Sequence, residues 1–187
     1  MKINPIPLAE TWQGMEELVE SGLARNIGIC NYNSGLLHDL MAYSNIKPAI
    51  LQIESHPYLT QNNLITQAKD YNISVTAFSP LGSLSYVELG MASENDSILN
   101  RREVLEIAEE IGRTPAQTVL RWGVQRGNAI IPKTVKPKRL KENIDLFNFS
   151  LSGRQMELIT SLNCNQRFND PAVFCKSEFG KFCSIYD

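Results

Sequence analysis

The most constraining feature of this sequence is a repeated alternation between short apolar segments and longer segments with helical periodicity. Four apolar segments have the length of strands, and helix-period residues separate each from the next: RNIGICNY, AILQIE, SVTAFSP and AIIPK. Strands rich in Ile, Val and Ala that are joined through helices form parallel sheets, normally buried on both faces. The alternation therefore predicts an α/β fold with about four parallel strands.

The helix-period segments carry their own start and stop signals. Thr114 followed by Pro115 is typical of a helix N-terminus, Ser34 is expected to cap another helix, and Gly22 stands near the end of the first. A polar stretch at about 83–100 precedes the fourth helix. The predicted helices cover residues 11–24, 34–44, 61–71, 102–112, 114–127, 136–147 and 152–162.

Two architectures fit this order of elements: an open doubly wound sheet, or part of a (β/α)8 barrel. No GxGxxG fingerprint follows any of the strands, which favours the barrel. A complete barrel needs about 250 residues, whereas this sequence has 187, and its first helix has no strand before it. A partial barrel has two unpaired edges, and we expect inward side chains such as Ile27, Ile29, Leu51 and Val75 to be partly uncovered.

Charge and composition exclude several classes of partner. The net charge of -2 gives no reason to expect nucleic acid, although five basic residues gather between Lys133 and Lys141 and suggest a small anion. No signal peptide and no run of 18 apolar residues occurs, so neither a membrane nor secretion is expected. The four cysteines, at 30, 164, 175 and 183, have irregular spacing without CxxC. These features predict reduced thiols, no metal site and a soluble, cytoplasmic protein.

Polar residues follow all four predicted strands, where ligand-binding residues of barrels lie. They are Cys30-Asn31, Gln52 within AILQIE, the run Phe78–Ser83, and Pro132-Lys133-Thr134. Gln52 and Glu54 share one face of their strand because side chains alternate. Each signal also has a plain structural interpretation: Asn31 as a turn residue, SPLGS as a turn, Gln52 bonded to backbone, and the basic cluster as a solvated helix face. Singly, none is specific.

Together, six strings resemble the second half of aldo-keto reductases in order and spacing: IGICNYN, QIESHPYL, VTAFSPLGS, TPAQTVLRWGVQRG, IIPKTVKPKRLKEN and NQRFNDP. The resemblance runs from about residue 7 to about 171, and RFNDP makes it xylose- or aldose-reductase-like. It implies the C-terminal half of a (β/α)8 TIM barrel with the N-terminal half missing. Residues 1–187 would then be a single partial barrel domain with a C-terminal tail at about 163–187.

The resemblance also implies an NADP site. Asn31 and Gln52 are similar to the pair that hydrogen-bonds the nicotinamide carboxamide, with Cys30 in place of a serine. Phe78 stands where the family usually stacks a tyrosine on the ring, and Asn169 is similar to a substrate-binding residue. The rest of the implied site consists of Ser79, Leu81, Gly82 and Ser83 for the pyrophosphate, Lys133, Thr134 and Arg139 for the 2′-phosphate, and Glu142 and Asn143 for the adenine.

The activity implied is NADPH-dependent reduction of a sugar-like aldehyde or ketone by hydride transfer. In the family a tyrosine, its lysine and aspartate partners and a histidine supply the acid, and all four come from the first half. None of this sequence's residues is therefore assigned as catalytic; His56 is expected to be a hydrogen-bonded structural residue and His38 an exposed helical one. The alternatives are a non-catalytic cofactor-binding or interaction protein derived from such an enzyme, or a longer chain for which Met1 is not the true start. We expect the uncovered barrel edges to favour self-association.

Overall fold

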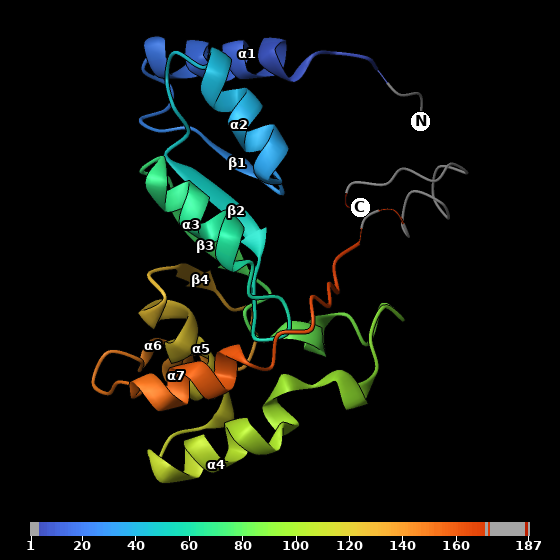
Figure 1. Ribbon diagram of the computed structural model, residues 1–187, viewed down its shortest axis with the longest axis vertical. Helices are drawn as coiled ribbons and strands as arrows, with labels where there is room; N and C mark the ends of the chain where they lie inside the picture. Colours follow the sequence, from blue (N-terminus) through green and yellow to red (C-terminus); the bar gives the residue numbers. More distant parts are fainter. Residues whose placement is uncertain (1–3, 171, 173–185, 187) are drawn as a thin grey trace.

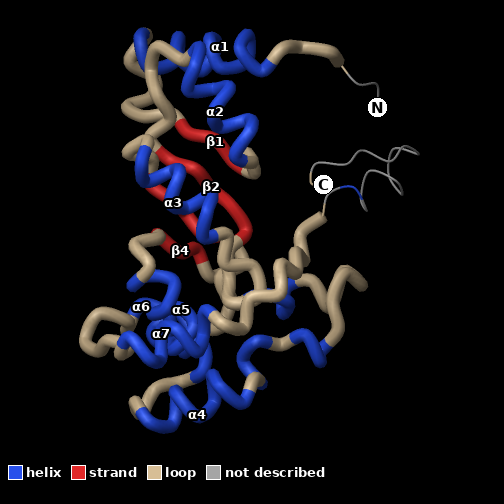
Figure 2. Tube along the Cα trace, in the orientation of Figure 1, coloured by secondary structure: helices blue, strands red, loops and turns tan. Residues whose placement is uncertain are grey.

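The computed structural model describes residues 4–170, 172 and 186, and there the chain forms one parallel four-stranded sheet in the order β1-β2-β3-β4 (Figures 1 and 2). The strands are β1 (Gly28–Cys30), β2 (Ile50–Glu54), β3 (Ser74–Phe78) and β4 (Ala129–Ile131). In the ladder Cys30 pairs with Gln52, and Glu54 pairs with Phe78. The predicted α/β class with four parallel strands, corresponding to half of a (β/α)8 barrel, is confirmed.

Helices fill the positions that the periodicity predicts, within a few residues at each end. Thr114 caps its helix and Pro115 opens it, as expected, with Gln117 completing a capping box. The cap of α2 is not Ser34, however, but Asn33, whose side chain accepts the Leu36 N–H. The helices are α1 (Leu8–Glu20), α2 (Ser34–Tyr43), α3 (Asn62–Asp70), η1 (Gly82–Ser85), η2 (Glu94–Asp96), η3 (Ile98–Asn100), α4 (Arg102–Glu110), α5 (Pro115–Gln125), α6 (Pro137–Ile144) and α7 (Gly153–Thr160).

The two faces of the sheet differ in what covers them. Ile27, Ile29, Leu51 and Val75 are only 0–8% exposed, because they pack in one cluster with apolar residues of α1, α2 and α3. The expectation that these side chains face inward and lie partly uncovered is wrong. In AILQIE the set that meets the helices, Leu51 and Ile53, is the apolar one, whereas Gln52 and Glu54 lie on the other side, so the alternation agrees with the observed orientation.

The opposite face of the sheet is the open one among the described residues. Ile50 is 39% and Ile131 48% exposed there, and Cys30 is exposed as well. Cys30 pairs with Gln52, and Ile131 pairs with Phe78. Ile50 is two positions from Gln52 on β2, and because side chains alternate along a strand, all of these lie on one face of the sheet. A sheet buried on both faces is therefore not what the described chain forms. The large apolar residues left uncovered on this face are Ile50 and Ile131.

The second half of the chain forms a separate packing region around α4, α5 and α7, which lie together below the sheet in Figure 1. Trp122 of α5 is 1% exposed, packs against Ile107, Leu151 and Ile159, and donates its indole N–H to the Thr160 hydroxyl at 3.0 Å. This region holds α5 and α6 beside the ends of β3 and β4, where the groove described below opens.

Within the residues described here, no helix has both the length and the apolar character needed to cross a membrane. Cys30 and Cys164 are free thiols. Cys175, Cys183 and most of the predicted tail at 163–187 lie outside the described residues.

Candidate functional site

A groove of about 880 Å³ opens at the carboxyl ends of β3 and β4, against α5 and α6. We call it the β3–β4 groove. Its lining comes from the loop after β3, from η3, α4 and the start of α5, and from the loop after β4 that continues into α6. These segments bring together eight of the residues predicted from the sequence, namely Ser79, Leu81, Gly82, Lys133, Thr134, Arg139, Glu142 and Asn143.

The loop after β3 has an unusual backbone. Ser79 and Gly82 adopt left-handed conformations, with φ of 48° and 71°. A Cβ atom on Gly82 would lie 2.5 Å from the Cδ1 atom of buried Ile98, so the position favours glycine, and any side chain there would have to displace Ile98. Ser83 is also buried, and its hydroxyl has no hydrogen-bond partner among the described residues. The loop thus offers close backbone approach to the groove, whereas the buried Ser83 hydroxyl does not line it.

A side-chain hydrogen bond between the two ends of this loop holds it in place. The Tyr86 hydroxyl lies 2.7 Å from the Ser79 hydroxyl oxygen. Burial raises the pKa of Tyr86 above its ordinary value, although the hydrogen bond with Ser79 opposes the rise. Tyr86 therefore remains a neutral hydrogen-bonding group around neutral pH.

The opposite wall of the groove is cationic. Lys133, Lys136 and Arg139 line it and are exposed, and within the described residues no carboxylate lies at ion-pair distance from any of them. Glu142 also lines the groove, but its carboxylate lies 3.9 Å from the Lys138 ammonium. Three unneutralised cations facing a glycine-containing loop can bind an anion with more than one phosphate.

The other predicted cofactor residues do not line this groove. Cys30 and Phe78 end β1 and β3, and Gln52 lies in the middle of β2 in register with Cys30, all on the open face of the sheet. The Asn31 N–H donates to the Gln52 carbonyl at 2.9 Å, with Asn31 in a left-handed conformation at φ 58°. Its side-chain oxygen is buried without a partner in the described chain. The predicted residues thus form two groups, one in the groove and one along the strand ends.

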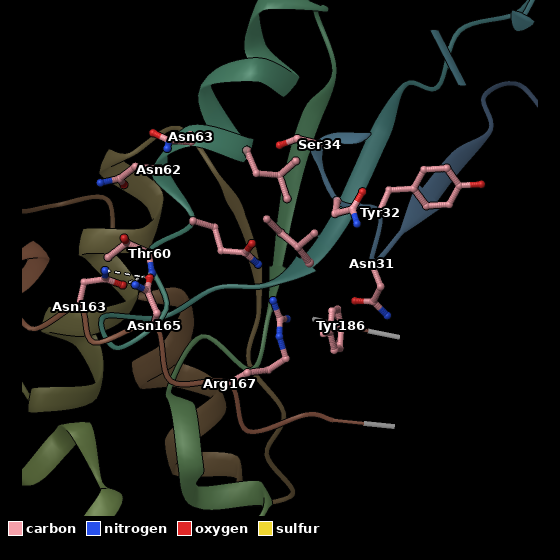
Figure 3. Close-up of a pocket in the computed structure, with 14 residues that line it drawn as sticks. Asn31, Tyr32, Ser34, Thr60, Asn62, Asn63, Asn163, Asn165, Arg167 and Tyr186 are labelled. Carbon is pink, nitrogen blue, oxygen red and sulfur yellow. Dashed lines mark hydrogen bonds between the residues drawn. The ribbon is translucent and has the colours of Figure 1, made fainter. Parts of the chain in front are cut away.

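Asn31 instead lines a second cavity, of about 420 Å³, between the start of α3 and the segment after α7. Figure 3 shows Asn31 and Tyr32 on one side, with Arg167 and Tyr186 next to each other below. The Arg167 guanidinium lies 3.6 Å from the centre of the Tyr186 ring. No sequence pattern predicted this cavity, although the NQRFNDP string contains part of its wall.

Glu54 is a buried group to which the sequence motifs assign no role. It is 0% exposed, and one carboxylate oxygen lies 3.0 Å from His56 Nε2. The expected hydrogen bonding of His56 is confirmed, as is the exposure of His38, whose Nδ1 lies 2.6 Å from the Tyr71 hydroxyl. Asn169, predicted to bind substrate, donates its backbone N–H to Glu54 at 3.0 Å. The one signal in the sequence that could have pointed to Glu54 is that an acidic residue ends an otherwise largely apolar strand.

Comparison with known proteins gives one family. The sequence profile described as the Aldo/keto reductase family matches residues 3–164. The probable NAD(P)H-dependent D-xylose reductase xyl1 of Aspergillus fumigatus is 48% identical over 173 residues, which are 91% of this chain and 55% of that protein. The NAD(P)H-dependent D-xylose reductase xyl1 of Aspergillus niger is 47% identical over 166 residues, 88% of this chain and 52% of that protein.

Solved structures agree with these relatives. The aldose reductase from Schistosoma japonicum matches with a TM-score of 0.78 and 35% identity, covering 88% of this chain and 50% of that one. The apo form of Gox0644 matches with a TM-score of 0.76 and 34% identity, covering 86% and 55%. The chain spans about half the length of the curated relatives it matches.

Proposed function

This chain belongs to the aldo/keto reductase family, and from that premise we propose that its β3–β4 groove binds the phosphate-bearing adenosine end of NADP(H). The protein containing it would reduce sugar-like aldehydes or ketones. The D-xylose reductases among its relatives support this substrate class. When bound, the reduced nicotinamide supplies a hydride to a carbonyl carbon.

One observation carries the proposal: three cations without carboxylate partners in the described chain line the same groove as a loop whose conformation favours glycine at Gly82. A pyrophosphate with an additional 2′-phosphate carries several negative charges, and charge-assisted hydrogen bonds from Lys and Arg are the strong contacts for it. The hydroxyl of NAD at the same ribose position would leave these cations without a ligand. We therefore infer a preference for NADP.

Two buried polar atoms test whether the residues fit this cofactor. Buried polar groups nearly always have a hydrogen-bond partner, yet the Asn31 side-chain oxygen and the Ser83 hydroxyl have none among the described residues. An amide oxygen suits the N–H of a carboxamide, and a hydroxyl suits a phosphate oxygen. The Asn31 oxygen, in a residue that lines the second cavity, supports the carboxamide contact, whereas the Ser83 hydroxyl does not line the groove and lends no support to the phosphate contact.

In this proposal each group of residues holds one part of the cofactor. Asn31 and Gln52, with Cys30 beside them, orient the carboxamide, and Phe78 stacks against the nicotinamide ring. The remaining contacts are Ser79, Leu81, Gly82 and Ser83 to the pyrophosphate, Lys133, Thr134 and Arg139 to the 2′-phosphate, and Glu142 and Asn143 to the adenine. Asn169 contacts the substrate.

Replacing Arg139 tests the assignment directly. Because a hydrogen bond to a charged group contributes about 1.5–3 kcal/mol, Arg139→Ala should weaken NADP⁺ binding by about ten- to a hundredfold and leave NAD⁺ binding unchanged. Lys141→Ala is the matched control, since it removes a cation from the same helix outside the groove. Titration of both cofactors by fluorescence measures the effect. Equal affinities of the wild type for NADP⁺ and NAD⁺ would refute the 2′-phosphate site.

We also propose that the 187-residue chain alone does not turn over a carbonyl substrate. Hydride transfer builds negative charge on oxygen and needs a nearby proton donor. Burial raises the pKa of Tyr32, Tyr58 and Tyr86, which is the wrong direction for an acid at neutral pH. This favours the second candidate function, a non-catalytic cofactor-binding protein, for the chain by itself. NADPH oxidation with reactive aldehydes, above the rate without protein and abolished by one tyrosine substitution, would contradict it.

The domain, its association and its partners follow from the same premise. Residues 1–187 act as one partial barrel domain with a tail from about 163. The open sheet face and the two sheet edges favour self-association, because unpaired strands and exposed apolar residues associate. The protein works in the cytoplasm on a small carbonyl compound, without a nucleic-acid or membrane partner.

A further inference from the structure

Glu54, at the carboxyl end of β2, is bound through both carboxylate oxygens. One oxygen accepts the backbone N–H of Phe168 at 2.9 Å and lies 3.0 Å from His56 Nε2. The other accepts the backbone N–H of Asn169 at 3.0 Å, with the Arg167 guanidinium 3.8 Å away. Two successive amides of a segment more than 110 residues later in the chain therefore converge on one buried side chain.

Burying a carboxylate is costly unless hydrogen bonds and positive charge compensate for lost water. Hydrogen bonds from backbone N–H groups to an ionised acceptor are among the strong ones. If residues 167–169 moved away, Glu54 would lose both amides and the nearby guanidinium while remaining at the sheet end. The buried Glu54 side chain thus holds this segment in one position through its two backbone contacts.

Phe168 connects this held segment to the β3–β4 groove by packing against residues of the groove loop. Phe168 is 2% exposed, and its ring packs against the rings of His56 and Tyr86, with centroids 5.2 Å and 6.1 Å away. An atom of the ring would be 3.5 Å from a Cβ on Gly82. Tyr86 in turn contacts the Ser79 hydroxyl at 2.7 Å. Phe168 is therefore packed directly behind the loop of residues 79–86, which forms one wall of the groove.

We propose that Glu54 is a positioning residue for this groove: it fixes Phe168 behind the loop of residues 79–86 and so presets the loop for the cofactor phosphates. The identity of the ligand rests on the proposed function, whereas the connection from Glu54 to the loop does not. Because coupling between two sites is reciprocal, cofactor binding also strengthens the hold on residues 167–169.

The structure offers a matched control for this idea. Glu16 is likewise buried, at 7% exposure, and accepts two successive backbone N–H groups, from Asn45 at 2.7 Å and Ile46 at 2.9 Å. It lies on α1, and none of these three residues lines either cavity. Glu16→Gln therefore removes the same kind of interaction as Glu54→Gln without touching the groove.

The experiment compares the full 187-residue wild type, Glu54→Gln and Glu16→Gln. Amide hydrogen exchange by NMR is followed at Phe168 and Asn169, and at Gly82, whose N–H bonds the Ser79 carbonyl at 2.8 Å. In Glu54→Gln we expect all three amides to exchange about tenfold faster or more, and the Kd for NADP⁺ to rise about two- to thirtyfold. Glu16→Gln should leave these local quantities at wild-type values.

If Glu54→Gln does not fold, Phe168→Leu replaces it, since leucine fills apolar space without stacking on Tyr86. That variant should keep the Asn169 amide protected, loosen the Gly82 amide and weaken NADP⁺ binding. Wild-type exchange at Gly82 in Glu54→Gln, or in this substitute, overturns the positioning role. If the wild type does not bind NADP⁺, the proposed function fails, and the exchange at Gly82 without ligand still decides the role of Glu54.

Discussion

Gly82→Ala is the substitution whose cost the structure defines most sharply. Gly82 has φ of +71°, and a Cβ there would lie 2.5 Å from Ile98 Cδ1 and 3.4 Å from Cγ1. A left-handed backbone costs an L-residue about 1–2 kcal/mol. Overpacking a filled core costs about 1–3 kcal/mol more, and Ile98 is fully buried at 0% exposure. We expect Gly82→Ala to lower the free energy of unfolding by about 2–5 kcal/mol.

Gly90→Ala separates these two costs. Gly90 has nearly the same conformation, with φ of +68°, but nothing lies within 4 Å of the point that its Cβ would occupy. It should therefore lose only the backbone contribution of about 1–2 kcal/mol. Denaturation in urea, followed by the fluorescence of the two tryptophans, gives both values. Equal losses for Gly82→Ala and Gly90→Ala would refute the packing argument.

Ile98→Val provides an internal check, because it removes the methyl group that the new Cβ would meet. Alone it should cost about 0.5–1.5 kcal/mol. Combined with Gly82→Ala, it should give a double variant more stable than the sum of the two losses predicts, by about 1 kcal/mol or more. Strictly additive losses would show that the Cβ of residue 82 does not meet Ile98.

Two further predictions concern acid stability and association. Desolvation raises the pKa of Glu16, but hydrogen bonds from the N–H groups of Ile46 and Asn45 outweigh it and leave this pKa below its ordinary value. The stability that results is fully present above the pKa of the unfolded state, about 4.3. It is lost as the pH falls through the pKa of the folded state. Glu16→Gln should thus flatten the acid limb of unfolding curves and lower neutral stability by about 1–3 kcal/mol; an unchanged acid limb would contradict this. Replacing Ile50 and Ile131 on the open face with Lys should shift sedimentation toward monomer, whereas Leu158→Lys, on an exposed helix position, should not; a monomeric wild type would refute the expectation.

Sequence periodicity predicted the elements well, because each strand and helix is encoded locally. Thr114 and Pro115 mark their helix start directly, whereas Asn33 and Ser34 are adjacent residues of similar capping ability, and the sequence does not distinguish them. The covering of the sheet was less predictable. The alternation in AILQIE separates Leu51 and Ile53 from Gln52 and Glu54, but that α1–α3 bury the apolar side completely depends on tertiary contacts.

The candidate site likewise has a part that the sequence predicted and a part that it did not. The groove residues follow strand ends or occupy one helix face, so a resemblance in order and spacing was enough to select them. Their division into a groove group and a strand-end group was not foreseen, because it depends on how α5 and α6 pack beside β4. The cavity beside Asn31 and Arg167 joins segments more than 130 positions apart, which no local pattern encodes.

Glu16 and Glu54 are two residues whose different effects cannot be predicted from the neighbouring sequence. In the sequence both are acidic residues next to apolar ones, and in the structure both are buried carboxylates that accept two consecutive backbone N–H groups. Their consequences differ because of what the bound segment touches next. The segment held by Glu16 closes a connection before β2, whereas the segment held by Glu54 places Phe168 against Tyr86 and behind Gly82. A buried charge thus affects the groove only through the side chains packed beyond it, and these are set by tertiary structure.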